Sequence, residues 1–258
     1  MEKRTVVMLI EKQREINSKK SWFPFVLPMG VFLVLSSIEP KPNSEASWIS
    51  IPISFYPWIY AGKLFITLVA LCLVWTEYRP LMRSIGWKGI ACGIIGGILW
   101  IALCSLEWEQ STLHPLLRSL RLEGVFGSST RSAFNPFIEL KGNTFGILMY
   151  LAVRGAGLIL VVPVIEEYFL RAFLMRFFAS EEWWAYPIGR VTFLSAILGT
   201  SLPMLMHPDE LLAAAFWFSW ITVLAWHSKN LWECIAAHCV TNLIVGTYVI
   251  AYGAWRLV

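Results

Sequence analysis

Apolar residues occur along this chain in long blocks, without the amphipathic stripes of soluble helices. Runs without a charged residue cover positions 22–38, 46–62, 64–76, 89–106, 155–165, 191–206, 211–226 and 239–255. A bilayer core requires about 20 mostly apolar residues per helix, in a range of roughly 17–25. Several runs reach that length once their flanking residues are added. The pattern predicts about seven transmembrane helices, and six to eight are compatible with it.

Two of these runs differ from a simple transmembrane helix. The run 46–62 contains Pro52 and Pro57, which favour an interfacial or re-entrant segment over a straight helix. Whether it is a span or a re-entrant piece stays open at this point. The run 155–165 is too short to cross a bilayer, so its helix must extend through charged residues.

Composition supports a lipid environment. Hydrophobic residues make up 57% of the 258 positions and charged residues 15%, against about 25% charged residues in soluble domains. The mean hydropathy is +0.61. The chain has 14 tryptophans, a residue type that favours the membrane–water interface. The predicted fold class is therefore all-α, a polytopic transmembrane helix bundle, with membrane lipids as its surroundings.

The distribution of lysine and arginine predicts the orientation. Six of them lie within residues 1–20 and three within 77–88, and such residues concentrate on the cytoplasmic side of a membrane. We expect both segments to face the cytoplasm, in a multi-pass protein of the bacterial cytoplasmic membrane. The net charge of +4 is thus a feature of topology, and no nucleic-acid partner is expected. The sequence leaves the oligomeric state open.

The chain divides into two unequal parts. Residues 1–141 hold a basic N-terminal tail, about three spans with no ionisable residue deep in an apolar run, and a long polar loop from 107 to 141. Residues 142–258 hold about four spans, and here polar residues do occur within apolar surroundings. Ionisable groups at membrane depth are costly, so a function is their default explanation.

The first polar cluster is Glu166-Glu167-Tyr-Phe-Leu-Arg171, which directly continues an apolar run. Glu167 and Arg171 are four residues apart, so they share a helix face and can pair with the acid before the base. Glu166 lies about 100° around the helix and cannot share that face. We therefore expect a structural pair and one carboxylate that points elsewhere.

Histidines supply the other two clusters. His207 ends the run 191–206, and His238 lies in the last span, four residues before Asn242, on one helical stripe. Each cluster alone has an ordinary interpretation: a solvated helix end for the glutamates, a turn for His207, a bond to a nearby carbonyl for His238. Together in one half of the chain they favour a site in which Glu166, His207, His238 and Asn242 converge on a polar cavity.

These motifs resemble those of the CPBP intramembrane proteases, which include the type II CAAX prenyl proteases and bacteriocin-immunity relatives. That family shows E-E-x-x-x-R, F-x-x-x-H and H-x-x-x-N/D in this order. The stretches 166–171 and 238–242 match the first and third motifs, whereas Pro203 stands four residues before His207 where the family has Phe. The resemblance covers residues 150–250. Residues 131–137 (Arg-Ser-Ala-Phe-Asn-Pro-Phe) are similar to the CAAX-protease-related proteins of exosortase systems.

The resemblance implies a hydrolase, an endopeptidase that cuts a membrane-tethered or exported protein. Glu166 would activate a water held with His207, and His238 and Asn242 would stabilise the oxyanion. Glu167 and Arg171 would support the site. Metal dependence stays open: no metal is assigned, although Glu166, His207 and His238 have the chemistry of a divalent zinc site. It is also open whether the substrate is prenylated.

Two other functions remain as alternatives. One is a non-catalytic scaffold or immunity-type protein of the same fold, and the other is an ion- or proton-coupled transporter. A transporter would require ionisable groups in both halves, and the first 106 residues offer none in their apolar runs. The predicted spans also create a conflict, because they place His207 on the order of 15 Å from the depth of Glu166. A longer helix through Arg176 or a bend at Pro203 would reduce that separation.

Overall fold

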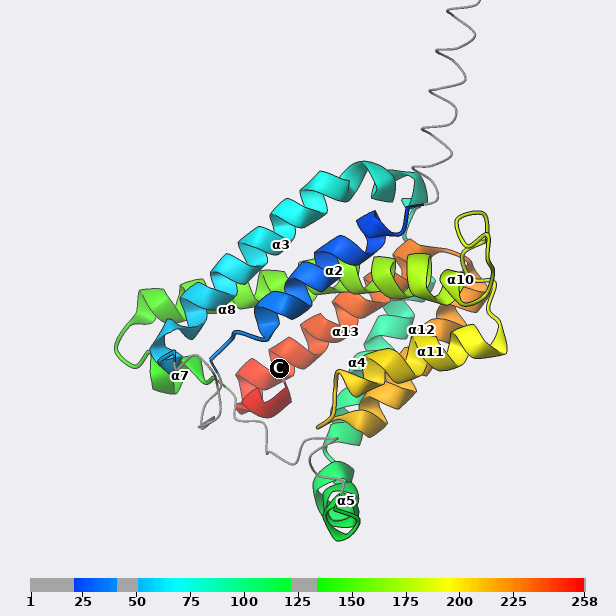
Figure 1. The fold of residues 1–258 in the computed structure, drawn as a ribbon. Helices are drawn as coiled ribbons and strands as arrows, with labels where there is room; N and C mark the ends of the chain where they lie inside the picture. The colour runs from blue at the N-terminus through cyan, green and yellow to red at the C-terminus, as the bar shows by residue number, and fades with distance from the viewer. Residues whose placement is uncertain (1–20, 41–50, 122–133, 258) are drawn as a thin grey trace, which may run out of the picture.

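The computed structural model describes residues 21–40, 51–121 and 134–257, and every regular element in these ranges is a helix (Figure 1). The basic residues of positions 1–20 lie outside the described part of the chain. The predicted all-helical class is confirmed. Backbone groups in lipid must be satisfied within the segment itself, which explains why the apolar runs adopt this one conformation.

Five helical segments are long and apolar enough to cross a membrane. They are Ile53–Leu81, Trp87–Leu116, Thr144–Phe177, Leu211–Ser228 and Leu231–Tyr252. Two shorter apolar helices, α2 (Phe23–Ser36) and α11 (Phe193–Leu205), accompany them. The described residues therefore contain five helices long enough to span, where about seven spans were predicted, and two shorter apolar helices.

The ambiguous run 46–62 has no helix of its own within the described residues. Its later part forms the 3-10 turn η1 (Ile53–Phe55) and the start of α3 (Tyr56–Tyr78), while 46–50 lie outside the described ranges. Pro57 occupies the first turn of α3, where a missing backbone N–H breaks no helical hydrogen bond. The part of the run 46–62 that begins at Ile53 thus belongs to the same helical segment as the run 64–76.

Helices α2 and α3 lie side by side across one face of the bundle (Figure 1). The end of α3 meets the start of α2, because the Tyr78 hydroxyl donates to the Pro24 carbonyl at 3.2 Å. Tyr78 also stacks on Tyr168, with ring centroids 3.7 Å apart, and the Tyr168 hydroxyl donates to the Tyr78 carbonyl. These aromatic contacts fix α2 and α3 against the helix that carries the two glutamates.

The helix α4 (Trp87–Cys104) packs closely against α13 (Leu231–Tyr252) along a stripe of glycines. A Cβ at Gly89 or Gly93 would lie 2.5–2.6 Å from atoms of α13, so glycine allows the two backbones to approach. Glu233 of α13 reinforces the contact, since its carboxylate accepts hydrogen bonds from the Gly86 and Gly89 amides at the start of α4. Small residues serve this purpose because lipid provides no hydrophobic force between helices.

The segment Thr144–Phe177 is one continuous helix that runs through the whole bundle. It consists of α8 (Thr144–Ala156), the π-helical turn η4 (Gly157–Val161), α9 (Val162–Glu167), the π-helical turn η5 (Tyr168–Leu174) and α10 (Met175–Phe177). The run 155–165 does extend through charged residues, as predicted. Because the helix continues past Arg176, Glu166 lies well inside it and not at its end.

Residues 107–121 and 134–141 of the long polar loop lie within the described part of the chain. They include the π-helical turn η3 (Glu109–Leu113), α5 (His114–Ser119), which projects away from the bundle in Figure 1, and α7 (Pro136–Glu139). Glu109 is buried and accepts a hydrogen bond from the Leu212 amide at 2.8 Å, which ties the loop to the start of α12 (Leu211–Ser228). Its Gly- and Ser-containing stretch 124–130 lies outside the described residues.

The first 106 residues contain an ionisable group that the sequence analysis missed. Lys63, inside α3, is only 4% exposed, and its ammonium pairs with the Glu39 carboxylate at 2.5 Å and donates to the Ser36 hydroxyl. The expectation that no ionisable residue lies deep in the N-terminal apolar runs is therefore wrong. The pair is possible because Glu39 follows α2, the helix that packs against α3.

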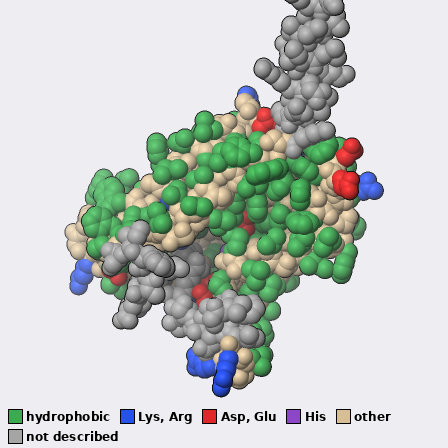
Figure 2. Space-filling model, viewed as in Figure 1, with side chains coloured by type: hydrophobic (Ala, Val, Ile, Leu, Met, Phe, Trp, Pro, Cys, Tyr) green, Lys and Arg blue, Asp and Glu red, His purple; other side chains and the backbone are tan. Residues whose placement is uncertain are grey.

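The outer surface is predominantly apolar. Figure 2 shows hydrophobic side chains over most of the visible face and charged ones mainly near its edges. Large side chains such as Phe193, Trp58 and Trp87 are 75–85% exposed. A soluble monomer rarely exposes apolar patches of this extent, so the chain is an integral membrane protein whose apolar helices face lipid.

Candidate active site

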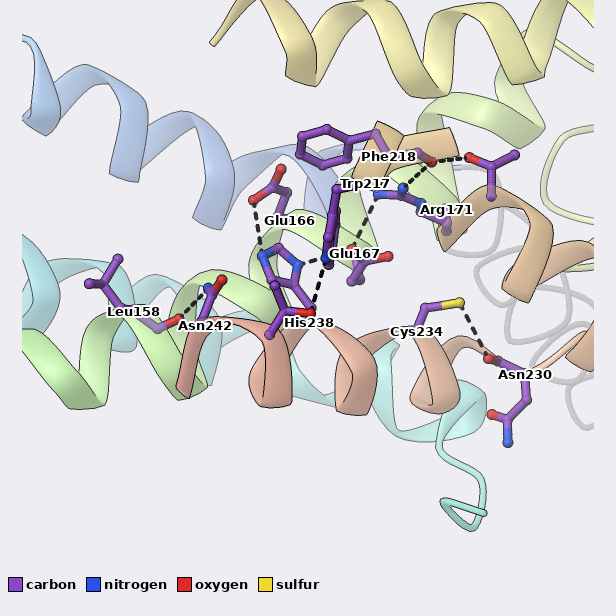
Figure 3. A network of polar contacts seen from close by, with 12 residues as sticks. Leu158, Glu166, Glu167, Arg171, Trp217, Phe218, Asn230, Cys234, His238 and Asn242 are labelled. Atoms are coloured by element: carbon purple, nitrogen blue, oxygen red, sulfur yellow. Dashed lines mark hydrogen bonds and ion pairs between the residues drawn. The ribbon is translucent and has the colours of Figure 1, made fainter. Parts of the chain in front are cut away.

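The two glutamates lie at the end of α9, where the long helix passes into the π-helical turn η5. Glu166 is 4% and Glu167 0% exposed. Their side chains leave the helix in different directions, since successive residues are rotated by about 100°. Figure 3 shows the two carboxylates on different sides of the His238 ring. Neighbours in the sequence thus acquire different partners.

Glu167 is held by two cationic or polar side chains. Its Oε1 accepts from Arg171 Nη1 at 3.2 Å and lies 3.1 Å from His238 Nδ1. Arg171 also donates to the Phe218 carbonyl at 3.5 Å and lies over the Phe218 ring. The predicted pair of Glu167 and Arg171 is present and buried, and it connects the long helix to α12 and α13.

Glu166 has a different environment. Its Oε2 lies 4.0 Å from His238 Nε2, and its Oε1 is buried without a hydrogen-bond partner. A buried carboxylate oxygen without a partner is energetically costly. Glu166 lines a cavity inside the bundle, so this oxygen is placed to bind a water or a substrate group.

His238 and Asn242 extend from one stripe of α13. The His238 ring lies between the two glutamates and packs on Trp217 of α12 with centroids 4.6 Å apart. Trp217 in turn donates to the Thr241 hydroxyl at 3.0 Å. The Asn242 amide donates to the Leu158 carbonyl at 2.7 Å (Figure 3). This carbonyl belongs to the π-helical turn η4, so one N–H of Asn242 holds α13 to the long helix.

His207 follows the last residues of α11. Its Nδ1 lies 2.9 Å from the Pro203 carbonyl, and its ring contacts Trp100 and Phe218 with centroids 5.6 and 5.7 Å away. Aromatic side chains of α4 and α12 thus flank the histidine in a chain that has Pro203 in place of the family's phenylalanine.

A single cavity collects the four predicted residues. Its lining includes Glu166, His207, His238 and Asn242. The remaining lining residues were not predicted as site residues, and they are Trp100, Arg154, Leu158, Val162, Glu210, Trp217, Phe218, Thr241, Val245 and Leu257. The sequence signal for Arg154 was a charge next to the run 155–165, and the one for Glu210 was an acid in the turn after His207.

The predicted spans place His207 and Glu166 at different depths, but in the structure both line this cavity. Two features account for this. Helix α11 has only 13 residues, about 20 Å at 1.5 Å per residue, so it does not carry His207 across a full membrane. The linker before α11 folds back on the long helix, because Arg176 donates to the Trp184 and Tyr186 carbonyls.

The described residues contain no group of three or more His, Cys, Asp or Glu side chains arranged to hold a metal ion. Glu166, His207 and His238 share the cavity but do not form such a cluster. The residues present do not fit the zinc site left open above, and no step below passes through a metal.

Comparison with known proteins gives one match. Residues 148–244 match the family model described as type II CAAX prenyl endopeptidase Rce1-like, a range that includes all four cavity residues predicted above. No match was found among curated proteins or among solved structures. The match confirms the resemblance of this part of the chain to the CPBP and CAAX family of proteases. It does not reach residues 131–137, so the likeness to the exosortase-associated group stays a prediction, and 131–133 lie outside the described residues.

Proposed function

We propose that this protein is an intramembrane endopeptidase that hydrolyses a peptide bond of a membrane-tethered or exported protein, with Glu166 as the residue that activates water. The observation that carries the proposal is the Glu166 carboxylate, which lines the cavity with one oxygen unpartnered and the other 4.0 Å from an imidazole nitrogen. A protease family match over the same residues supports it.

The proposed reaction begins with a water bound to Glu166 in the cavity. The carboxylate takes a proton as the water oxygen attacks the substrate carbonyl, and the negative charge moves to the carbonyl oxygen. Protonated Glu166 then passes that proton to the leaving amine, which completes hydrolysis to an acid and an amine. His207 contributes a ring nitrogen that helps to hold the water.

The oxyanion requires donors, and α13 supplies them in this proposal. Asn242 has a second N–H besides the one given to the Leu158 carbonyl. His238 is oriented by Glu167, which contacts its Nδ1 and leaves Nε2 towards Glu166. With its proton on Nε2, the ring would donate to the oxyanion from that atom. A water-poor cavity strengthens such hydrogen bonds.

Cleavage in proteoliposomes tests this proposal. Candidate membrane-tethered proteins are incubated with wild type, Glu166→Ala, Glu166→Gln and the control Glu181→Gln, which changes an exposed acid in the linker before α11. We expect cleavage by wild type and the control, and almost none by either Glu166 variant. Equal cleavage by Glu166→Ala would contradict the proposal, and a protein that cleaves nothing at all would favour a non-catalytic scaffold.

The transporter alternative needs the same test, because Lys63 and Glu39 do place ionisable groups in the N-terminal part. Those two groups neutralise each other, which favours a structural pair over an ion path. If proteoliposomes showed Glu166-dependent proton or ion flux without any cleavage, transport would replace hydrolysis as the function.

A further inference from the structure

Arg154 is a cation inside the long membrane helix Thr144–Phe177. The proposed reaction does not use it. It lies ten residues after the start of α8 and is part of the cavity lining. Arginine remains charged in proteins, and a charge at membrane depth is rare unless it is paired or functional. Its position therefore requires an explanation that helix formation alone does not give.

The surroundings of Arg154 leave its charge without an acidic partner. Its guanidinium lies 4.5 Å from the centroid of the Tyr60 ring, and its Nε is buried without a hydrogen-bond partner. No salt bridge joins Arg154 to an acid within the described ranges. The nearby acid, Glu39, already pairs with Lys63. An aromatic wall thus supports the cation on one side, and the cavity remains on the other.

The cavity places this cation and the proposed catalytic carboxylate in the same space. Arg154 and Glu166 are twelve residues apart on one continuous helix, which corresponds to about 18 Å of helical rise. An extended peptide covers about 3.3 Å per residue. A chain that lay along the helix with its cleaved bond at Glu166 would bring a group about four to six residues away to Arg154, allowing for the length of the arginine side chain.

We propose that Arg154 is a specificity residue that binds a carboxylate of the peptide substrate, about four to six residues from the cleaved bond. This inference rests on the proposed function. The planar guanidinium donates in a fork that matches the two oxygens of a carboxylate. The carboxylate is that of an Asp or Glu side chain or of a chain terminus, since both have the same chemistry. A lipid phosphate is the other anion that a guanidinium binds, and the binding measurement below distinguishes it from a peptide carboxylate.

The cleavage test uses palmitoylated peptides in proteoliposomes. Apolar peptides with a carboxamide end carry one Asp that moves position by position, and each has an Asn counterpart. A second pair differs only in a C-terminal carboxylate or carboxamide. Wild type is expected to cleave an acidic peptide about tenfold faster or more than its neutral counterpart when the acid lies at the right distance, since charged hydrogen bonds have about this strength.

Arg154→Gln should bring the ratio of the cleavage rates of acidic and neutral peptides close to one, while the control Arg83→Gln should leave this ratio unchanged. Arg83 is an exposed residue of the loop before α4, so its replacement alters the net charge equally without reaching the cavity. The Asp series and the terminal pair show which source of carboxylate is used. Two results would overturn the proposed role of Arg154: cleavage by wild type without any preference for acidic peptides, or a preference that Arg154→Gln retains. Neither result would contradict the proposed function.

A binding measurement separates the two proposals if no peptide is cleaved. The dissociation constants of the same peptides are measured on Glu166→Gln and on Glu166→Gln with Arg154→Gln, in nanodiscs of neutral lipid. We expect tighter binding of the acidic peptides by about tenfold, lost in the double variant. Equal or absent binding of acidic and neutral peptides would overturn the inference. The inference would also be overturned if phosphatidylglycerol, and not the peptides, raised the thermal stability in a way that depends on Arg154. That result would assign the site to a lipid headgroup.

Discussion

At the scale of single residues, the site depends on the different environments of two adjacent glutamates. Glu167 is fully buried and accepts from Arg171 while it contacts His238, whereas Glu166 keeps one oxygen unpartnered in the cavity. Glu167 positions the His238 imidazole, and Glu166 is the carboxylate that we propose as the base. Their partners lie on two further helices, so the arrangement depends on the packing of the whole bundle.

Loss of Arg171 should therefore destabilise the protein strongly. Arg171→Ala leaves the Glu167 carboxylate buried and without its cation, a change that typically costs about 3–5 kcal/mol. The matched control is Arg256→Ala, whose bond to Glu107 joins two side chains that are 47% and 57% exposed, and which should cost less than about 1 kcal/mol. Chemical denaturation in detergent micelles measures both. Similar losses in the two variants would contradict a buried pair.

Asn242→Ala should reduce turnover by about 10²–10³, the usual effect of removing one oxyanion donor. The variant also loses the bond to the Leu158 carbonyl, so its unfolding must be measured beside its kinetics. An effect on kcat with little change in KM, in a protein that remains folded, supports a role in the transition state. A loss that follows stability alone would limit Asn242 to holding α13 against the long helix.

At the scale of elements, hydropathy predicted which segments are helical but not how deep each residue lies. The apolar run 191–206 predicts a full span, yet α11 has 13 residues and follows a linker that is fixed by hydrogen bonds from Arg176. Lys63 escaped notice because its partner, Glu39, follows a different helix. The i, i+4 pairs were predictable since they lie within one helix, whereas the contact of His238 with Glu167 joins residues 71 positions apart.

The glycine stripe of α4 provides a test of helix packing. Gly93→Ala adds a Cβ that would lie 2.5 Å from the Ala237 carbonyl oxygen and 2.7 Å from the Val240 Cβ, so α4 and α13 must separate and stability should fall by about 1–3 kcal/mol. The control Gly62→Ala adds its Cβ in α3 with nothing within 4 Å and should be neutral or stabilising by up to about 1 kcal/mol. Thermal unfolding in detergent compares them. Equal behaviour of the two variants would contradict the close helix contact.

At the scale of the whole molecule, the described chain places its candidate chemistry within one group of helices. The long helix, the end of α11 and α13 supply the four predicted residues. Helix α12 adds Trp217 and Phe218 to the cavity, and α4 from the N-terminal part adds Trp100. The division at residue 141 therefore remains a useful proposal for where the chemistry lies, although the two parts share one core. Helices α2 and α3 cover the glutamate-bearing helix through Tyr78 and Tyr168.

The orientation of the molecule in its membrane is the last prediction. The contact of Tyr78 with the Pro24 carbonyl places the start of α2 and the end of α3 at the same side of the bundle. Residues 1–20 precede α2 in the sequence and residues 77–88 include the end of α3. We therefore expect their six and three positive charges on the same side, the cytoplasmic one. Single cysteines introduced at Lys12 and Arg83, in a variant without the native exposed Cys72, should both resist a membrane-impermeant thiol reagent in intact cells and react after lysis. Labelling of both in intact cells would invert the topology, and labelling of only one would contradict the shared side that the contact of Tyr78 with Pro24 requires.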